Sequence, residues 1–231
     1  MSDSPYPNAP VREVVFEIRF PGEPAVECRR DRLFERVRGE FPEVLVPTQT
    51  RPEVGHAALL PYKFAASDGS RSLLCALNLF AYSSTRYPGF TPFRDEALRW
   101  LREFQADVPL RRLIRTGLRY VNMIPLMPDS PLHELLAIQL SLGSYSPEAL
   151  RNVSLSLEIP RSGGTLNMRL GPAATTDGPL LILDFDYVKT ADLEFDHLAD
   201  YLQESHDETK ALFESLVTER YRAYLQGEVI A

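Results

Sequence analysis

Short segments with an apolar residue at every second position alternate along this chain with longer segments that have apolar residues at every third or fourth position. Residues 10–20 show the first pattern, with Phe16 and Ile18 alternating with Glu13 and Glu17. Because successive side chains of a strand point to opposite faces, the pattern predicts a half-buried strand.

The next segments predict two helices and a hairpin. Residues 31–41 and 93–104 carry apolar side chains at helical spacing. Residues 62–66 and 72–82 are predicted to be strands, because the Ser-Asp-Gly-Ser sequence between them is typical of a hairpin turn. Both faces of the second strand are apolar, so we expect it at the centre of a sheet.

Residues 111–126 join the clearest strand pattern to the densest group of arginines. From Ile114 onward this segment alternates as a strand does. The apolar face of the predicted strand is formed by Ile114, Leu118, Tyr120, Asn122 and Ile124, and the other face by Arg115, Gly117, Arg119, Val121 and Met123. Residues 10–126 therefore follow the order β-α-β-β-α-β, which is that of a ferredoxin-like unit. In that topology the first and fourth strands are antiparallel neighbours.

The second half is predicted to be mainly antiparallel sheet, followed by a helix. Residues 195–226 have an apolar stripe at three- and four-residue spacing, which predicts one long helix that either lies across the sheet or pairs with another chain. Residues 171–179 are predicted to be a loop. The predicted strands are residues 135–142, 153–159, 165–170 and 180–189.

The predicted fold class is α+β: a ferredoxin-like first half, a mainly antiparallel β second half and a long C-terminal helix. We expect residues 1–9 to be a flexible tail and residues 10–231 to be one compact unit. The unit would consist of the ferredoxin-like half, residues 10–126, and the sheet with the long helix, residues 127–231.

Composition is that of a globular protein from a reducing compartment. The 231 residues are 44% hydrophobic and 25% charged, and the sparse cysteines, Cys28 and Cys75, are expected to be free thiols. The polar, proline-rich start predicts no signal peptide, and no apolar run is long enough for a membrane span. We therefore expect a cytoplasmic protein with no membrane partner.

The net charge of −7 has its acidic excess in residues 177–231. An acidic total disfavours non-specific binding to nucleic acid, because Lys and Arg contacts with phosphate dominate that affinity. A local group of arginines remains a candidate site for an anion or a partner, because guanidinium groups bind phosphate and carboxylate in a bidentate manner. Its members are Arg111, Arg112, Arg115 and Arg119.

The favoured alternative for these arginines is ion pairing with Glu13 and Glu17 across neighbouring strands. Glu17 is the expected competitor for Arg119. Arg115 is therefore the better candidate for reaching something outside the fold.

Two aspartates, Asp184 and Asp186, lie two residues apart on one strand face. Paired carboxylates at this spacing hold Mg²⁺ or Mn²⁺ in other proteins. A solvent-facing strand gives the same pattern, and we favour that interpretation. A metal site would need a third ligand, such as Glu158 or His206, to converge with them.

His206 falls inside the apolar stripe of the C-terminal helix and, with Tyr120 and Asn122, forms a candidate polar core site. Buried polar groups need hydrogen-bond partners, so a structural role is the favoured interpretation for all three. A role for His206 as general base or ligand is the alternative.

Several catalytic signatures do not occur in this sequence. It contains no Gly-x-x-x-x-Gly-Lys-Ser/Thr loop, Gly-x-Gly-x-x-Gly turn, Gly-x-Ser-x-Gly elbow or His-Glu-x-x-His helix. Gly163 and Gly164 lie between two predicted strands and indicate a hairpin turn. No cofactor is expected, and a non-catalytic role is favoured over an enzyme.

The chain resembles a sporadically distributed prokaryotic family of unknown function. The resemblance rests on the Pro-x-x-Glu of the first strand, Gly-Leu-Arg-Tyr-x-Asn from Gly117, the Asp-x-Asp strand from Asp184, and the histidine of the C-terminal helix. The resemblance implies a cytosolic protein of one unit, from mobile or defence-related gene clusters. It supplies no catalytic residues.

Three functions are compatible with these features. The preferred hypothesis is a non-catalytic interaction module, a subunit or adaptor of a larger prokaryotic assembly, with homo-oligomers formed through the long helix. The second is an RNA- or nucleotide-binding protein, in which Arg86, Tyr87 and Phe90 join Arg115 and Arg119. The third is a metal-dependent hydrolase that uses Asp184, Asp186 and His206.

Overall fold

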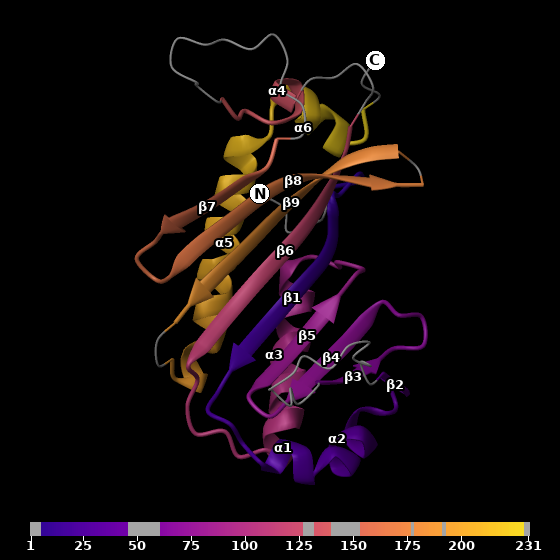
Figure 1. Cartoon of the computed structure of the whole chain (residues 1–231), viewed down its shortest axis with the longest axis vertical. Helices are drawn as coiled ribbons and strands as arrows, with labels where there is room; N and C mark the ends of the chain where they lie inside the picture. Colours follow the sequence, from indigo (N-terminus) through magenta and orange to yellow (C-terminus); the bar gives the residue numbers. More distant parts are fainter. Residues whose placement is uncertain are drawn as a thin grey trace, which may run out of the picture.

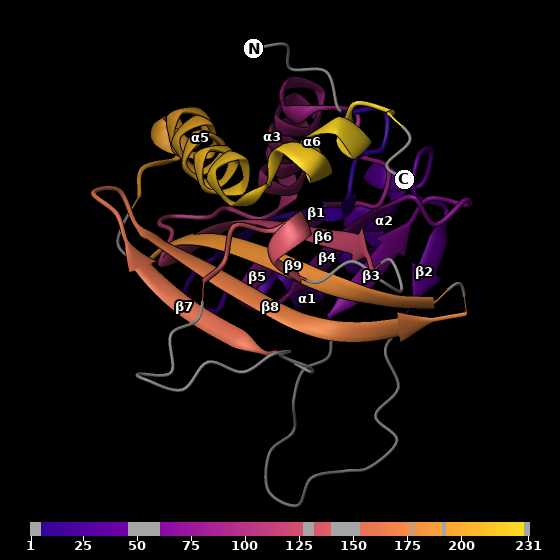
Figure 2. The same cartoon turned by 90° about the horizontal axis from the view of Figure 1, so that it is seen from above.

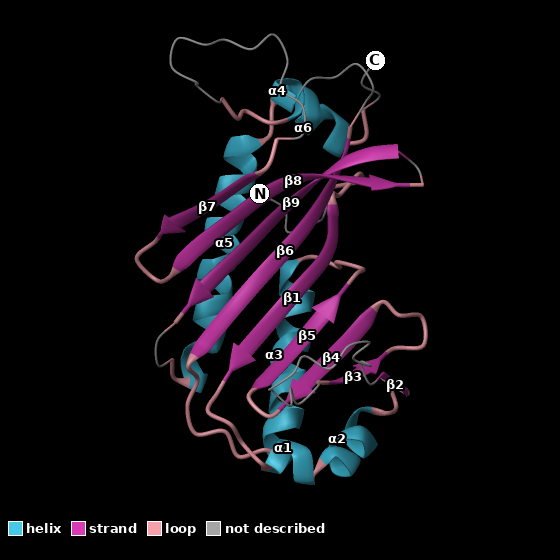
Figure 3. Cartoon of the chain, viewed as in Figure 1, coloured by secondary structure: helices cyan, strands magenta, loops and turns pink. Residues whose placement is uncertain are grey.

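The computed structural model describes residues 6–45, 61–126, 132–139, 153–176, 178–190 and 193–228. All nine described strands belong to one sheet, in the order β2-β3-β4-β5-β1-β6-β9-β8-β7, and the long helices run along it (Figures 1 and 3). Each of these strands is antiparallel to its neighbours in the sheet. The fold is therefore α+β, as the sequence predicts.

The elements have the following bounds. The strands are β1 (Val11–Arg19), β2 (Glu43–Leu45), β3 (Tyr62–Ala65), β4 (Arg71–Ala76), β5 (Leu79–Ser84), β6 (Arg115–Pro125), β7 (Leu155–Pro160), β8 (Thr165–Thr175) and β9 (Gly178–Lys189). The helices are α1 (Ala25–Cys28), α2 (Arg30–Val37), α3 (Phe90–Asp107), α4 (Leu132–Leu135), the 3-10 turn η1 (Phe195–His197), α5 (Leu198–Leu216) and α6 (Glu219–Leu225).

The two longest helices, α3 and α5, lie side by side on one face of the sheet, and the sheet curves around them (Figure 2). The apolar side chains of β1 and β6 point into this layer, and Phe16 and Leu118 are fully buried. Tyr201 attaches α5 to the sheet, because its hydroxyl lies 2.8 Å from the carbonyl oxygen of Thr116. The opposite face of the central strands carries charged side chains. We call it the open face.

The strand order shows an internal repeat. Outward from the β1–β6 seam, the sheet continues as β5-β4-β3-β2 on one side and as β9-β8-β7 on the other. The first half runs β1-α1-α2-β2-β3-β4-β5-α3 and the second runs β6-α4-β7-β8-β9-η1-α5-α6, so in each half a long helix follows the strand that pairs with the seam. Tyr82 donates a hydrogen bond of 2.7 Å to Glu96 of α3, and Tyr187 donates one of 3.0 Å to Glu204 of α5. Apart from β2 and α6, the two halves therefore share their order of strands and long helix, and they share one tyrosine–glutamate contact.

The ferredoxin-like first half is not confirmed. Residues 72–82 were expected to form one strand, but the chain turns at Leu77 and Asn78, and two strands, β4 and β5, form instead. This extra reversal makes β5 antiparallel to β1, whereas a split β-α-β unit requires the corresponding strands to be parallel. The predicted antiparallel pairing of the first and fourth strands, now β1 and β6, is confirmed.

The long C-terminal helix is interrupted. Val217 is extended and forms a β-bridge with Leu136, so α5 ends at Leu216 and a separate helix, α6, follows. Thr218 caps α6, because its side-chain oxygen accepts a hydrogen bond of 3.2 Å from the backbone N–H of Tyr221. The prediction of one continuous helix over residues 195–226 is therefore wrong.

Two predictions for the second half also need correction. The strand expected at residues 135–142 is not found in residues 135–139: Leu135 ends the short helix α4, and Leu136 forms only an isolated bridge with Val217. Residues 140–142 lie outside the described part. The expected loop at residues 171–179 consists mostly of the ends of β8 and β9. Pro172 is tolerated there because β7 pairs with β8 only as far as Leu170, so no third strand needs the missing N–H.

The described part of the expected N-terminal tail is attached to the C-terminal helices. The Tyr6 hydroxyl donates a hydrogen bond of 2.6 Å to Glu214, and the backbone N–H of Asn8 donates one of 3.1 Å to Leu225. Both cysteines are free thiols, Cys28 exposed and Cys75 buried. Within the described residues, no helix is long and apolar enough to cross a membrane.

Candidate functional site

The arginines of β6 are paired with carboxylates on the open face. Nε and Nη2 of Arg119 donate hydrogen bonds of 2.8 Å each to the two carboxylate oxygens of Asp184 on β9. Asp184 is only 6% exposed. A bidentate pair with a buried carboxylate is a strong, directional contact, so Arg119 acts as a link between β6 and β9.

Arg115 bridges the strands on both sides of β6. It donates a hydrogen bond to Glu17 on β1, and its Nη2 donates one of 3.1 Å to Asp186 on β9. Gly117 lies between these groups: a Cβ there would stand 3.3 Å from Asp186 Oδ1 and 3.4 Å from Arg115 Nη1. The absence of a side chain at Gly117 therefore gives the guanidinium of Arg115 a path to Asp186.

The local environment changes the pKa values of two members of this network. The hydrogen bond with Asp184 raises the pKa of Arg119, so its charge is retained. Burial raises the pKa of Asp186, against the opposing effect of the Arg115 and Arg119 charges. The network thus pairs two guanidinium groups with three carboxylates across three strands, namely Arg115 and Arg119 with Glu17, Asp184 and Asp186.

Neither arginine of β6 has its expected partner. Arg115, the better candidate for reaching outside the fold, is the one that contacts Glu17, whereas Arg119 is paired with an aspartate from the second half. Arg111 and Arg112 precede β6 and are exposed. The pairing of β6 with β9 places Asp184 beside Arg119. These two residues are 65 positions apart, so no local pattern in the sequence indicates their contact.

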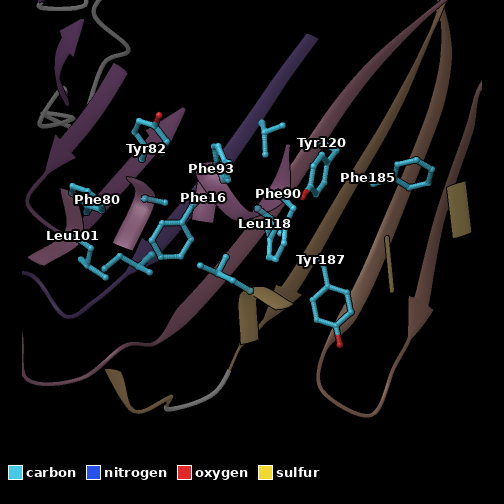
Figure 4. Packing of buried hydrophobic residues seen from close by; sticks show 14 of the residues in the cluster. Phe16, Phe80, Tyr82, Phe90, Phe93, Leu101, Leu118, Tyr120, Phe185 and Tyr187 are labelled. Carbon is cyan, nitrogen blue, oxygen red and sulfur yellow. The ribbon is translucent and has the colours of Figure 1, made fainter. Parts of the chain in front are cut away.

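His206, a residue of α5, lies on the other face of the sheet and contacts α3 and β6. Its Nδ1 is 2.9 Å from the Tyr120 hydroxyl, and its ring stacks on Phe90 with centroids 4.1 Å apart. Figure 4 shows Phe90 and Tyr120 among the buried aromatic side chains. Asn122 donates a hydrogen bond of 3.0 Å to the Leu183 carbonyl oxygen. The structure therefore brings Tyr120 and His206 together and leaves Asn122 in a separate contact within the sheet.

The candidate metal ligands are not brought together. Asp184 pairs with Arg119, and His206 pairs with the next residue, Tyr120, whose side chain points to the opposite face of β6. The sheet therefore separates the two aspartates from His206. Across the described ranges, no group of three or more His, Cys, Asp or Glu residues is placed to hold a metal ion.

The candidate nucleic-acid contacts are also dispersed. Phe90 is 2% exposed beneath His206, so its ring is not available to stack on a base. Arg86 pairs with Asp68 at 3.0 Å. Phe90 lies on the helix-covered face and Arg115 on the open face, so these residues do not form one binding surface.

The two outer strands of the sheet, β2 and β7, carry exposed apolar side chains. Leu157 on β7 is 45% exposed, and Val44 and Leu45 on β2 are 42% and 51% exposed. Of the four large hydrophobic side chains exposed in the described residues, only Ile114 lies outside these strands. The strand predicted at residues 153–159 is confirmed as β7, but its position at the edge of the sheet and the strand β2 were not predicted from the sequence.

Comparison with models of known protein families gives no match, and comparison with curated proteins gives none. The site is therefore interpreted from its geometry.

Proposed function

We propose that the chain is a non-catalytic interaction module, a subunit or adaptor of a larger assembly, that binds other proteins through the edges of its sheet. The observation that carries this proposal is the position of its exposed hydrophobic side chains, on the outer strands β2 and β7. An outer strand offers unpaired backbone N–H and C=O groups, and apolar side chains beside them favour the addition of a partner strand.

The charged network supports the same proposal indirectly. Arg115 and Arg119, the groups best suited to bind a phosphate, are occupied by Glu17, Asp186 and Asp184. A nucleic acid would have to displace these carboxylates. The RNA-binding hypothesis is thus less well supported than protein binding, and the metal-dependent hydrolase lacks a set of converging ligands within the described residues.

The family resemblance forms part of the proposal. A role as a subunit or adaptor in a prokaryotic assembly agrees with what the resemblance implies. Homo-oligomers formed through the long helix are not part of the proposal, because the apolar stripe of α5 packs against the sheet and α3. The exposed positions of α5 are polar or small, and include Asp200, Gln203 and Ala211.

Affinity capture with the tagged, full-length chain tests the proposal. Extracts of the source organism would be compared between wild type, Leu45→Lys, Leu157→Lys and the control Ala211→Lys, which places the same charge on the exposed side of α5. We expect a stoichiometric partner that is lost with an edge variant and retained with the control. An identical set of captured proteins for all four chains would contradict the proposal.

A further inference from the structure

β7 forms one edge of the sheet, and its central residues lack the side chains that most often prevent the addition of another strand. Leu155–Ile159 contains neither proline nor lysine, the residues that most often protect sheet edges, and Pro160 stands only at its end. β7 is the last strand of the sheet among the described residues. Leu157, at its centre, exposes nearly half of its side chain.

The sequence of β7 is complementary to itself in one antiparallel register. With Leu157 opposite Leu157 of a second copy, Leu155 lies opposite Ile159, and Ser156 lies opposite Glu158. Apolar side chains thus face apolar ones on the helix-covered side. A shift of two residues would place Glu158 opposite Glu158, and like charges directly opposite destabilise a sheet.

Charge complementarity selects the same register. Arg169 on β8 is the direct neighbour of Ser156 on β7. In the Leu157-centred pair, Glu158 of the second copy occupies the next place in that row, about 9–10 Å from Arg169 between Cα atoms. The small Ser156 side chain between them leaves room for an ion pair. Within the described ranges, neither Arg169 nor Glu158 already has an ion-pair partner.

We infer that β7 binds β7 of a second copy of this chain. The result is a symmetric dimer in which two nine-stranded sheets join into one, with the helices of both copies on the same side. The two-fold axis passes between the Leu157 residues, and each copy supplies one Arg169 and one Glu158 to the seam. This inference rests on the proposed function, because it names the occupant of one of the two sheet edges and leaves β2 for another protein.

Light scattering during size exclusion of the purified full-length chain tests the inference. We expect the mass of a dimer at high protein concentration and dissociation on dilution. Leu157→Lys should raise the dissociation constant by about 100-fold, because the change enters a symmetric interface twice. Leu45→Lys on β2 and Ala211→Lys on α5 should leave the dimer unchanged.

A charge reversal makes the test independent of any folding defect in Leu157→Lys. Arg169→Glu and Glu158→Arg should each weaken the dimer, and the double variant should restore it, because the pair is rebuilt in the opposite sense. A strict monomer at about 100 μM, a dimer indifferent to Leu157→Lys, or a double variant no better than the single ones would overturn the inference. A monomer that still captures a partner through β2 would contradict the self-pairing alone and leave the proposed function intact.

Discussion

Arg119 and Asp184 join two neighbouring strands of the sheet through a bidentate ion pair, with both hydrogen bonds 2.8 Å long. The pair connects β6 to β9, and Asp184 is buried within it. An arginine that the sequence indicates as a candidate ligand-binding residue is therefore engaged in holding the sheet together.

Removal of this pair should destabilise the protein unequally. Arg119→Ala leaves the Asp184 carboxylate buried without its partner, so we expect a loss of about 2–3 kcal/mol in the free energy of unfolding. The same substitution in an Asp184→Asn background should cost clearly less, because no buried charge is left behind. Denaturant unfolding of the single and double variants measures this coupling. Arg111→Ala, at an exposed position, is the control, and equal costs in both backgrounds would contradict the role assigned to the pair.

Gly164 is required by a close approach of two backbones. A Cβ at this position would lie 2.5 Å from the carbonyl oxygen of Val188 and 2.9 Å from a ring carbon of Tyr187. Gly164→Ala should therefore lower the free energy of unfolding by about 1–3 kcal/mol. Gly39→Ala, where a Cβ would meet no atom within 4 Å, should have little effect. A Gly164→Ala protein as stable as the Gly39→Ala protein would show that the β7–β8 hairpin is packed differently.

Thr116 buries a hydroxyl without a hydrogen-bond partner among the described residues. The residue is 1% exposed on β6, and valine has nearly the same shape. Thr116→Val should therefore raise the free energy of unfolding by about 1 kcal/mol, because a polar group no longer has to be buried. The matched change Thr218→Val should act in the opposite direction, because that hydroxyl caps α6. Thermal unfolding distinguishes the two signs, and a loss of stability in Thr116→Val would contradict this account of the site.

The contacts of Glu214 with Arg222 and Tyr6 should make the protein less stable in acid. Burial raises its pKa, but hydrogen bonds from Arg222 and Tyr6 outweigh that effect, so the pKa lies below the ordinary value of 4.5. A lowered folded-state pKa contributes stability above pH 4.5, and this contribution disappears as the pH falls through the folded-state pKa.

The stability difference between wild type and Glu214→Gln should therefore be greatest near pH 7, at roughly 1–2 kcal/mol, and should shrink below pH 4.5. Urea unfolding from pH 7 to pH 3 measures it. Glu43→Gln, at an exposed position on β2, is the control. A difference that stays constant over this range would rule out the assigned ion pair.

Local patterns were sufficient to predict several elements. The alternation of β1 and β6 identifies their buried faces correctly except at Ile114, which precedes β6 and is exposed, and helical spacing locates α3 to within a few residues. The reversal at Leu77 and Asn78 was missed because apolar residues continue through both strands. The break at Val217 and Thr218 was missed because the apolar stripe continues across the cap.

The site depends on contacts that no local pattern contains. Asp184 and Asp186 alternate as solvent-facing carboxylates would, and only the pairing of β9 with β6 places them against Arg119 and Arg115. The repeat of the two halves is similarly hidden, because the chain preserves its topology while its charges differ: the open-face positions of β5 include Leu79 and Ala81, whereas those of β9 include Asp184 and Asp186. The sequence therefore indicates which charged residues are candidates, but not which residues they pair with.

Amide hydrogen exchange on the native chain tests most directly whether the edge strand β7 binds a second copy of the chain. At high protein concentration the amides of β7 should exchange more slowly than in dilute solution, while those of β2 serve as the internal reference and do not change. In Leu157→Lys, the concentration dependence of β7 should disappear. Exchange of β7 that is the same at all concentrations, in wild type and variant alike, would contradict the pairing of β7 with β7.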